Sequence, residues 1–245
     1  MRRQYRINMV VSRQARVQPK ATESGPRARM QRMLLSSAME LMQRGTVPSV
    51  SEVAEEAGVS RATAYRYFPT QASMIQAAVG EALGPILAWK SEGGAAQERA
   101  AELIAFAYPR IEAYEATHRA TVLLSLGQWT RRRAGTLGDE APIVRGHRRR
   151  LLADAMAPLK PSLSRPAFDR LVQALSLVFG TEAFIVLKDI WGLDGDAARR
   201  VAIWAANAIV QAATAEAATT QGIRTIKVGN RKASTNGSKR AAANQ

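Results

Sequence analysis

A short run of hydrogen-bonding side chains stands near residue 60 of this 245-residue sequence. It combines guanidinium, hydroxyl and phenol groups with no acid, and its members are Arg61, Ala62, Thr63, Tyr65, Arg66 and Tyr67. Arginine can make two parallel hydrogen bonds to a guanine edge, and hydroxyl groups hold phosphate oxygens. An amphipathic helix with a solvated polar side explains two arginines but leaves two exposed tyrosines unexplained. The run therefore predicts contact with the phosphate-lined groove of a nucleic acid.

A short helix is predicted just before this run. Ser49 is followed three residues later by Glu52, a spacing that predicts a capping box around the first turn. The helix begins at Ser49 or Val50 and carries one apolar stripe. It ends at Gly58, because glycine adopts the left-handed backbone that terminates helices.

A second short helix holds the run itself. Ser60 can cap its first turn, and Pro69 disfavours helical geometry in Phe68, so the helix covers Arg61–Tyr67. Two short helices joined by a tight turn are the layout of a helix-turn-helix, whose second helix enters the major groove of DNA. The motif is placed at about residues 49–68.

The stretch from Ser49 to Pro69 closely resembles the DNA-binding signature of TetR-family transcriptional regulators. The matching residues are Ser49, Val50, Val53, Ala54, Ala57, Gly58, Val59 and the run from Ser60 to Pro69. The resemblance covers about residues 28–80, and the length and helical pattern of the remainder are also similar to that family. It implies a homodimer with two DNA-binding heads, a variable helical ligand domain, and repression that a small molecule relieves.

The resemblance also implies roles for individual side chains. Arg61 and Ala62 correspond to positions that contact bases, whereas Thr63, Tyr65 and Tyr67 correspond to positions that hold phosphates. With Arg66 and the two capping serines, the predicted DNA-binding site comprises Ser49, Ser60, Arg61, Ala62, Thr63, Tyr65, Arg66 and Tyr67.

Two positions depart from the family pattern. Ala64 stands where leucine or isoleucine is frequent, so the second helix of the motif is expected to pack less tightly. Thr70 and Gln71 stand where a lysine commonly follows the Phe-Pro turn, so one expected phosphate contact is missing. The basic N-terminal arm is a candidate to replace it, since arms of other DNA-binding folds follow the duplex or enter the minor groove.

Helical periodicity runs through the rest of the chain, and the predicted fold class is all-α. A first helix lies between Pro26 and Gly45, and a fourth starts at Thr70 and is kinked or broken near Pro85. Longer helices are expected at about residues 97–115, 117–133, 142–157, 165–191 and 196–217. The predicted division is a disordered basic arm at 1–26, a helix-turn-helix DNA-binding domain at 27–72, a helical ligand-binding and dimerisation domain at 73–218, and a disordered basic tail at 219–245.

The helices at 165–191 and 196–217 are apolar around more than one face. Because one stripe suffices for the core of a monomer, we expect them to form a four-helix bundle with their copies in a second subunit. The alternative is the core of a larger monomer. Candidates for lining a ligand pocket are Phe106, Tyr114, Trp129, Phe179 and Glu182, each equally compatible with core packing. Glu182 is expected to pair with Arg119 or another arginine.

The formal charge of +15 is concentrated at the two ends of the chain. Residues 1–26 hold six basic residues and one acid, and residues 219–245 hold six basic residues and no acid. A polyanion partner and a solubilising role are both compatible with such tails. A non-specific nucleic-acid-binding protein driven by these tails is therefore the alternative function.

Deleting residues 1–26 is expected to flatten the salt dependence of DNA affinity, because each cation near a phosphate releases a counterion. The measurement is the slope of the logarithm of the binding constant against the logarithm of salt concentration. An unchanged slope would remove the arm from the DNA interface.

The composition argues against several classes of function. The absence of cysteine excludes disulfides, thiol nucleophiles and thiolate metal sites. His118 and His147 have no partner at ligand spacing, so neither a metal nor a cofactor is expected. No catalytic motif is found, and an enzyme is not predicted. No apolar run approaches a membrane span of about 18 residues, and the protein is expected in the cytoplasm.

Overall fold

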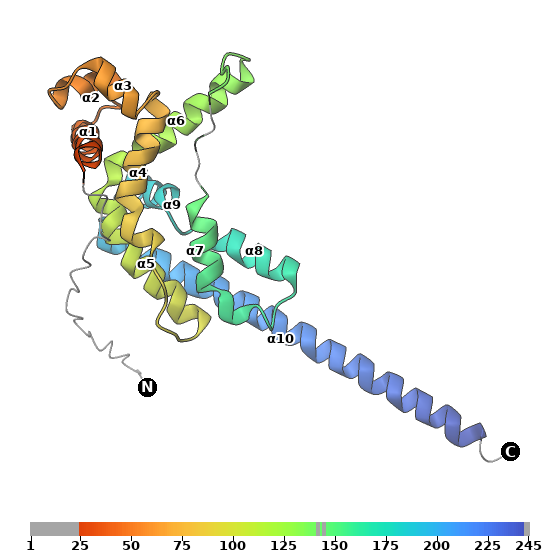
Figure 1. Ribbon diagram of the computed structural model, residues 1–245. Coiled ribbons are helices and arrows are strands. Elements are labelled where there is room, and N and C mark those ends of the chain that lie inside the picture. Colours follow the sequence, from red (N-terminus) through yellow and green to blue (C-terminus); the bar gives the residue numbers. More distant parts are fainter. Residues whose placement is uncertain (1–24, 141–142, 144–145, 243–245) are drawn as a thin grey trace, which may run out of the picture.

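The computed structural model describes residues 25–140, 143 and 146–242, with side chains described as far as residue 219. Every regular element in these ranges is helical, which confirms the all-α prediction (Figure 1). The predicted basic arm lies almost entirely outside the described residues.

Three helices form the end of the molecule that carries the motif: α1 (Pro26–Gln43), α2 (Val50–Glu56) and α3 (Arg61–Tyr67). Their apolar faces, together with the start of α4 (Gln71–Leu87), enclose one core. Its fully buried residues include Leu34, Ala38, Val53, Ala54, Ala64, Met74, Ile75 and Ala78. This confirms a helix-turn-helix domain at the N-terminal side of the chain.

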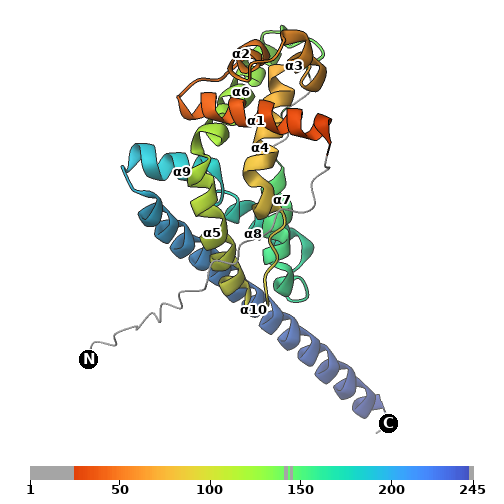
Figure 2. The ribbon, with the colours of Figure 1, turned by 60° about the vertical axis from the view of Figure 1, so that its left-hand side comes forward.

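Two helices connect this end to the rest of the molecule. Figure 2 shows α4 and α6 (Glu115–Arg133) running from the helix-turn-helix toward the long helix α10 (Gly195–Ala242). On α6, Ala116, Ala120 and Leu124 pack against the core of the helix-turn-helix. A shift of α4 or α6 is therefore transmitted directly to the first three helices.

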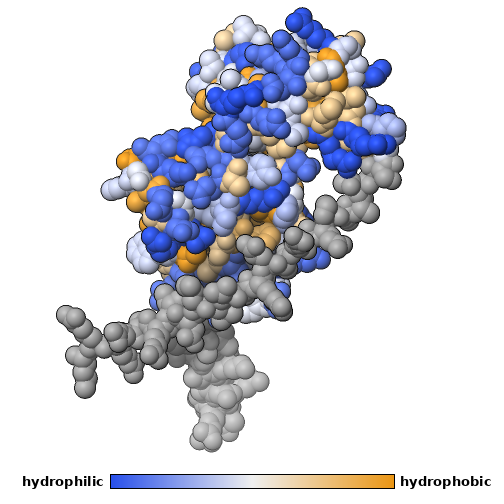
Figure 3. Space-filling model, turned by 90° about the vertical axis from the view of Figure 1, so that its left-hand side faces the viewer, coloured by the Kyte–Doolittle hydropathy of each residue, from blue (hydrophilic) through white to orange (hydrophobic). Residues whose placement is uncertain are grey.

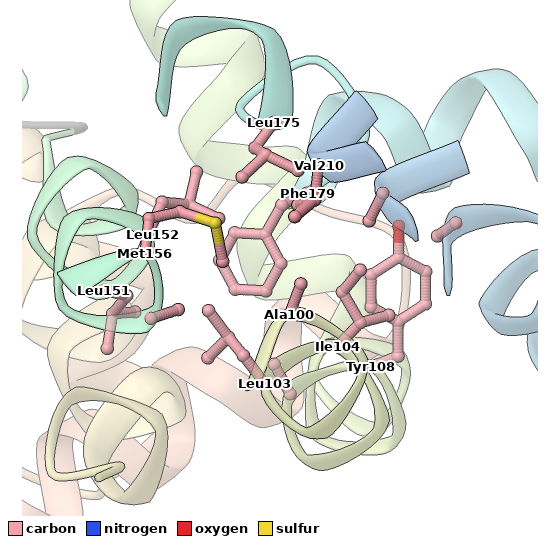
Figure 4. Packing of buried hydrophobic residues seen from close by; sticks show 14 of the residues in the cluster. Ala100, Leu103, Ile104, Tyr108, Leu151, Leu152, Met156, Leu175, Phe179 and Val210 are labelled. Atoms are coloured by element: carbon pink, nitrogen blue, oxygen red, sulfur yellow. The ribbon is translucent and has the colours of Figure 1, made fainter. Parts of the chain in front are cut away.

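The second core lies between α5 (Ala96–Ala113), α7 (His147–Ala155), α8 (Arg165–Leu175) and α10. Figure 4 shows the Phe179 ring among Leu103, Leu152 and Met156 in this core. The Tyr108 ring meets Phe184 edge-on, with centroids 5.6 Å apart. The Tyr108 hydroxyl donates to the Val178 carbonyl at 3.0 Å, and burial raises the pKa of this phenol. The polar end of the ring is thus satisfied inside the core.

Pro85 lies within the last turn of α4, where a distortion was predicted. Proline has no backbone N–H, so the Glu81 carbonyl four residues earlier loses its helical partner. The Arg110 guanidinium of α5 donates to that carbonyl at 3.0 Å and also to the carbonyl of Ala82. The defect in α4 is thereby converted into a connection between α4 and α5.

The prediction of a single helix over residues 165–191 is wrong. The chain forms α8, turns through 176–180, and continues as α9 (Thr181–Ile185) and one π-helical turn, η2 (Val186–Ile190). Gly180 has a φ of 113°, a left-handed conformation that only glycine adopts at little cost. The Arg148 guanidinium of α7 donates to the carbonyls of Ser176 and Phe179 at 3.2 and 3.3 Å. A distant arginine thus satisfies the carbonyls that the break exposes.

The predicted end of the last helix at 217, followed by a disordered tail from 219, is also wrong. The backbone of α10 continues to Ala242 and extends beyond the body of the molecule (Figure 1). Residues 195–242 contain no proline and many alanines, which favour a helix. The prediction of disorder relied on the basic charge and low hydrophobicity of this segment, and neither property stops a helix.

Five charged side chains form an ion-pair cluster between α5, α6 and η2: Glu112, Glu115, Arg119, Lys188 and Asp189. Arg119 binds Asp189 through both guanidinium nitrogens at 2.6 and 2.7 Å. Lys188 donates to Glu115 at 2.7 Å and to Glu112 at 3.4 Å. The hydrogen bond to Asp189 raises the pKa of Arg119 and lowers that of the carboxyl group. The start of α6 is therefore fixed to the segment before α10.

Candidate functional site

The first helix of the motif begins as the sequence predicted. The Ser49 backbone N–H donates to the Glu52 carboxylate at 2.7 Å, and the Glu52 N–H donates to Ser49 Oγ at 3.2 Å. This reciprocal pair is a capping box. The backbone hydrogen bond from Ser49 also lowers the pKa of Glu52. Ser49 is thus engaged in holding α2.

The turn between the two helices depends on one glycine. Gly58 has a φ of 65°, and the following Val59 N–H donates to the Ala54 carbonyl at 2.9 Å. Ser60 then caps α3 by accepting from the Thr63 N–H at 3.2 Å, while its hydroxyl lies 2.9 Å from Thr63 Oγ1. Two linked hydroxyl groups therefore stand at the N-terminus of α3, where backbone N–H groups favour an anion.

The two faces of α3 differ sharply. Ala64 is fully buried in the core, whereas Arg61, Ala62, Tyr65 and Arg66 are exposed. Tyr65 is 45% exposed, and its hydroxyl lies 3.4 Å from Ser51 Oγ of α2. Arg61 and Arg66 have no ion-pair partner within the part of the chain that the structure describes. Both guanidinium groups are therefore available to a ligand.

A groove of about 360 Å³ separates α3 from the beginning of α1. Its walls are Pro26, Arg27, Met30, Thr63, Arg66 and Tyr67. Two guanidinium groups and two hydroxyls around one groove suit a phosphate. Arg27 was not among the predicted site residues. Its position one residue after the start of α1, in a first turn without acids, was the available signal.

The two departures from the family pattern have structural counterparts. The small side chain of Ala64 is buried against the other helices of the domain. The Gln71 side-chain amide donates to the carbonyls of Val47 and Pro48, both at 3.1 Å, and ties the start of α4 to the loop before α2. Gln71 therefore serves the fold at this point.

Figure 3 shows the surface of one face of the molecule. Hydrophilic residues predominate there, including over the helix-turn-helix end, and apolar residues appear between them in small groups. No helix in the described residues is long and apolar enough to cross a membrane. The same ranges contain no cluster of three metal-ligating side chains.

A second feature is a cavity of about 80 Å³ between α4, α5, α6, α7 and the turn before α9. Its lining is mostly apolar and includes Leu83, Ile111, Val122, Leu151 and Phe179. Of the five residues predicted to line a pocket, Phe179 is the one found here.

The other four predicted pocket residues lie elsewhere. Phe106 and Trp129 are exposed, and the Tyr114 ring lies beneath the Arg110 guanidinium at 4.9 Å. Glu182 is paired with Arg148, as expected for an arginine partner, while Arg119 has Glu115 and Asp189. Residue type alone did not separate exposed aromatic rings from those facing the cavity.

The polar side chain that reasoning from the sequence missed is His118. It lines the cavity, is 5% exposed, and its Nε2 has no hydrogen-bond partner among the described residues. Burial and the nearby Arg110 charge lower its pKa to about 4, so the imidazole is uncharged at neutral pH. In the sequence, the small and apolar residues around His118 in α6 were the available indication that this side chain is buried.

A third feature is a set of exposed large apolar side chains on two segments, which we call the apolar patch: Leu177, Val186, Ile190, Trp191, Val201 and Trp204. Leu177, Val186 and Val201 line one groove of about 460 Å³ between the region of α9 and α10. Trp204 follows Val201 by one helical turn and therefore lies on the same face. Exposed patches of this kind are typical of protein interfaces.

Comparisons with known proteins agree with this architecture. Residues 34–78 match the model of bacterial regulatory proteins, tetR family. A tetR-family transcriptional regulator from Streptomyces coelicolor is similar in fold, with a TM-score of 0.54 at 16% identity over 78% of this chain and 83% of that one. A TetR transcriptional regulator from Rhodococcus sp. RHA1 aligns with a TM-score of 0.47 at 19% identity, over 76% and 97% of the two chains. No curated protein matches the sequence.

The family match spans the end of α1, both helices of the motif and the start of α4. It therefore covers the capped helices and the exposed face of α3 described above. The resemblance inferred from the sequence is confirmed for this region, because residues 34–78 match the family model of bacterial regulatory proteins, tetR family.

Proposed function

We propose that this protein is a dimeric repressor that binds a palindromic operator in the cytoplasm and is released by a small molecule. The exposed face of α3 is the observation that carries the DNA-binding part. Arg61 and Arg66, for which the described part of the chain offers no ion-pair partner, stand there on a helix whose start, turn and buried side are all fixed. A rigid helix with unpartnered guanidinium groups is suited to the major groove.

Within this proposal the contacts fall into two groups. Arg61 and Ala62, at the start of α3, read base edges. Thr63, Tyr65, Arg66 and Tyr67 hold phosphates, with Arg27 added by the groove that it shares with Arg66. Ser49 and Ser60 contribute through their caps, which aim the two helix N-termini. The DNA-binding domain is residues 27–72, and residues 73–218 bind the effector and the second subunit.

The apolar patch supports the dimer. Its residues belong to 177–191 and to α10, the two regions that the sequence analysis assigned to the subunit interface. Large rings such as Trp191 and Trp204 are costly to leave in water and are typical anchors of interfaces. A two-fold contact through this patch gives two recognition helices in one assembly, which matches a palindromic site.

Selection of bound DNA from a random pool tests the proposal. The expected result is one palindromic sequence that also occurs upstream of the gene for this protein. Footprinting of a variant lacking residues 1–24 and 220–245 is expected to protect the same site. A protein that binds without sequence preference, or that loses all protection with the tails, would instead be a tail-driven nucleic-acid binder.

Arg61→Ala is expected to weaken operator binding by about 1–3 kcal/mol per half-site and to relax the preference at one base position. The matched control is Arg66→Ala, which is expected to weaken operator and random DNA alike and to reduce the salt slope by about one. Both are measured by titration of labelled duplexes at several salt concentrations. An equal loss on all sequences for Arg61→Ala would assign this residue to phosphate.

A further inference from the structure

The cavity beside α6 contains an unsatisfied polar group. His118 Nε2 is buried and has no partner within the described residues, although a buried polar atom without a hydrogen bond costs free energy. Native proteins retain such groups where a ligand or water completes them. The imidazole can accept a hydrogen bond at Nε2 in one tautomer and donate one in the other.

The cavity offers no net charge to a ligand. His118 is uncharged at neutral pH, as shown by its lowered pKa. Arg148, a charged residue of the wall, is paired with Glu182 and donates to the carbonyls of Ser176 and Phe179, and His147, also in the wall, is exposed to solvent. A charged ligand would lose its hydration without gaining a counter-charge.

The size of the cavity limits the occupant. About 80 Å³ is less than the roughly 150 Å³ of a protein cavity that accepts benzene. A molecule with a single ring therefore enters only if the walls separate. Three of the wall residues, Val79, Leu83 and Ile86, belong to α4, the helix whose first half lies in the core of the helix-turn-helix.

We propose that this cavity binds a small uncharged molecule, about one ring in size and apolar except for one hydroxyl or carbonyl group, which pairs with His118 Nε2. The inference rests on the proposed function only in taking this cavity as the effector site.

Three probes of equal ring size test the ligand class on the full chain without DNA: phenol, benzene and benzoate. Thermal unfolding and calorimetric titration are expected to show phenol binding at least about tenfold tighter than benzene, because only phenol completes His118. Benzoate is expected not to bind. Equal affinity for phenol and benzene, or tighter binding of benzoate, would overturn the proposal.

Substitutions at the cavity identify the polar partner. His118→Leu is expected to raise the melting temperature of the unliganded protein and to abolish the preference for phenol over benzene. His118→Gln, which restores a hydrogen-bonding group, is expected to retain part of that preference. The control is Thr121→Val, because the Thr121 hydroxyl already donates to the Thr117 carbonyl at 3.1 Å. Loss of the preference in Thr121→Val but not in His118→Leu would contradict the assignment.

Nitrogen NMR gives a direct signature. The chain has two histidines, His118 and His147, so the two imidazole signals can be assigned by substitution. Phenol is expected to shift the Nε2 signal of His118, and an unshifted His118 signal on saturation would overturn the proposal. Because these readouts need no DNA, they remain valid if the DNA-binding assignment fails. Release of the selected operator by phenol then tests the connection between the two.

Discussion

Trp204→Asp is expected to convert the proposed dimer into monomers and to weaken palindromic operator binding accordingly. The Trp204 side chain is 73% exposed in the single chain, on the face of α10 that also bears Val201 of the apolar patch. Burying a carboxylate there without a partner is strongly unfavourable, and a two-fold interface contains the substitution twice. At about 2 kcal/mol for each copy, the dimer dissociation constant rises by about 1000-fold.

Sedimentation across a range of protein concentrations measures this change. The chain offers a matched control in Trp129, which is 61% exposed on α6 and outside the apolar patch. Trp129→Asp introduces the same charge in place of the same ring and is expected to leave the assembly intact. A dimer that survives Trp204→Asp and dissociates with Trp129→Asp would move the interface to α6.

Lowering the pH from 7 to 4 is expected to remove about 3 kcal/mol of unfolding free energy through His118 alone. The pKa of this imidazole is about 4 in the folded chain, against 6.5 for an unperturbed histidine. Between these values the unfolded chain binds the proton and the folded chain does not, so acid favours unfolding. The stabilisation is complete above pH 6.5 and is lost as the pH falls toward 4.

Denaturant titrations at several pH values measure this contribution by comparing variants. His118→Leu is expected to lose that part of the pH dependence, whereas His147→Leu is expected to keep it, because His147 is exposed. Carboxyl groups with lowered pKa values, such as Glu115 and Asp189, also lose stabilisation in acid but are common to both variants. An identical pH slope in the two variants would show that His118 is not buried in the uncharged form.

The helix-turn-helix could be predicted almost residue by residue because its determinants are local. The capping box at Ser49, the left-handed turn at Gly58 and the stop at Pro69 each depend on residues within one or two turns of the chain. Such local signals agree with the fold that the whole chain adopts. The exposed face of α3 followed directly from them.

The break after α8 could not be predicted, because what stabilises it is distant in sequence. An uninterrupted apolar pattern over 165–191 favours one helix, and Gly180 alone is tolerated within helices. The decisive partner is Arg148, about 30 residues earlier, which satisfies the carbonyls of Ser176 and Phe179. The same dependence on tertiary packing explains why aromatic type was a poor guide to the cavity.

His118 illustrates a different limit. In the sequence it precedes an arginine and is unremarkable as a metal ligand. Its significance comes from burial and from the lack of a hydrogen-bond partner, two properties that exist only once α4, α5 and α6 have packed. Periodicity can assign a residue to a buried face, but it does not reveal which polar atoms remain unsatisfied there.

The ion-pair cluster has a consequence for the distance between the two half-sites of an operator. It fixes the start of α6 to the segment that bears Ile190 and Trp191, and the same half of α6 packs against the core of the helix-turn-helix. In a dimer built on that segment, the cluster sets the distance between the two helix-turn-helix domains along the DNA, whereas α3 sets the base sequence that each domain recognises. The distance between half-sites and the base sequence of each half-site then depend on different residues. A substitution such as Asp189→Asn is expected to change the preferred distance between half-sites and to leave their base sequence unchanged.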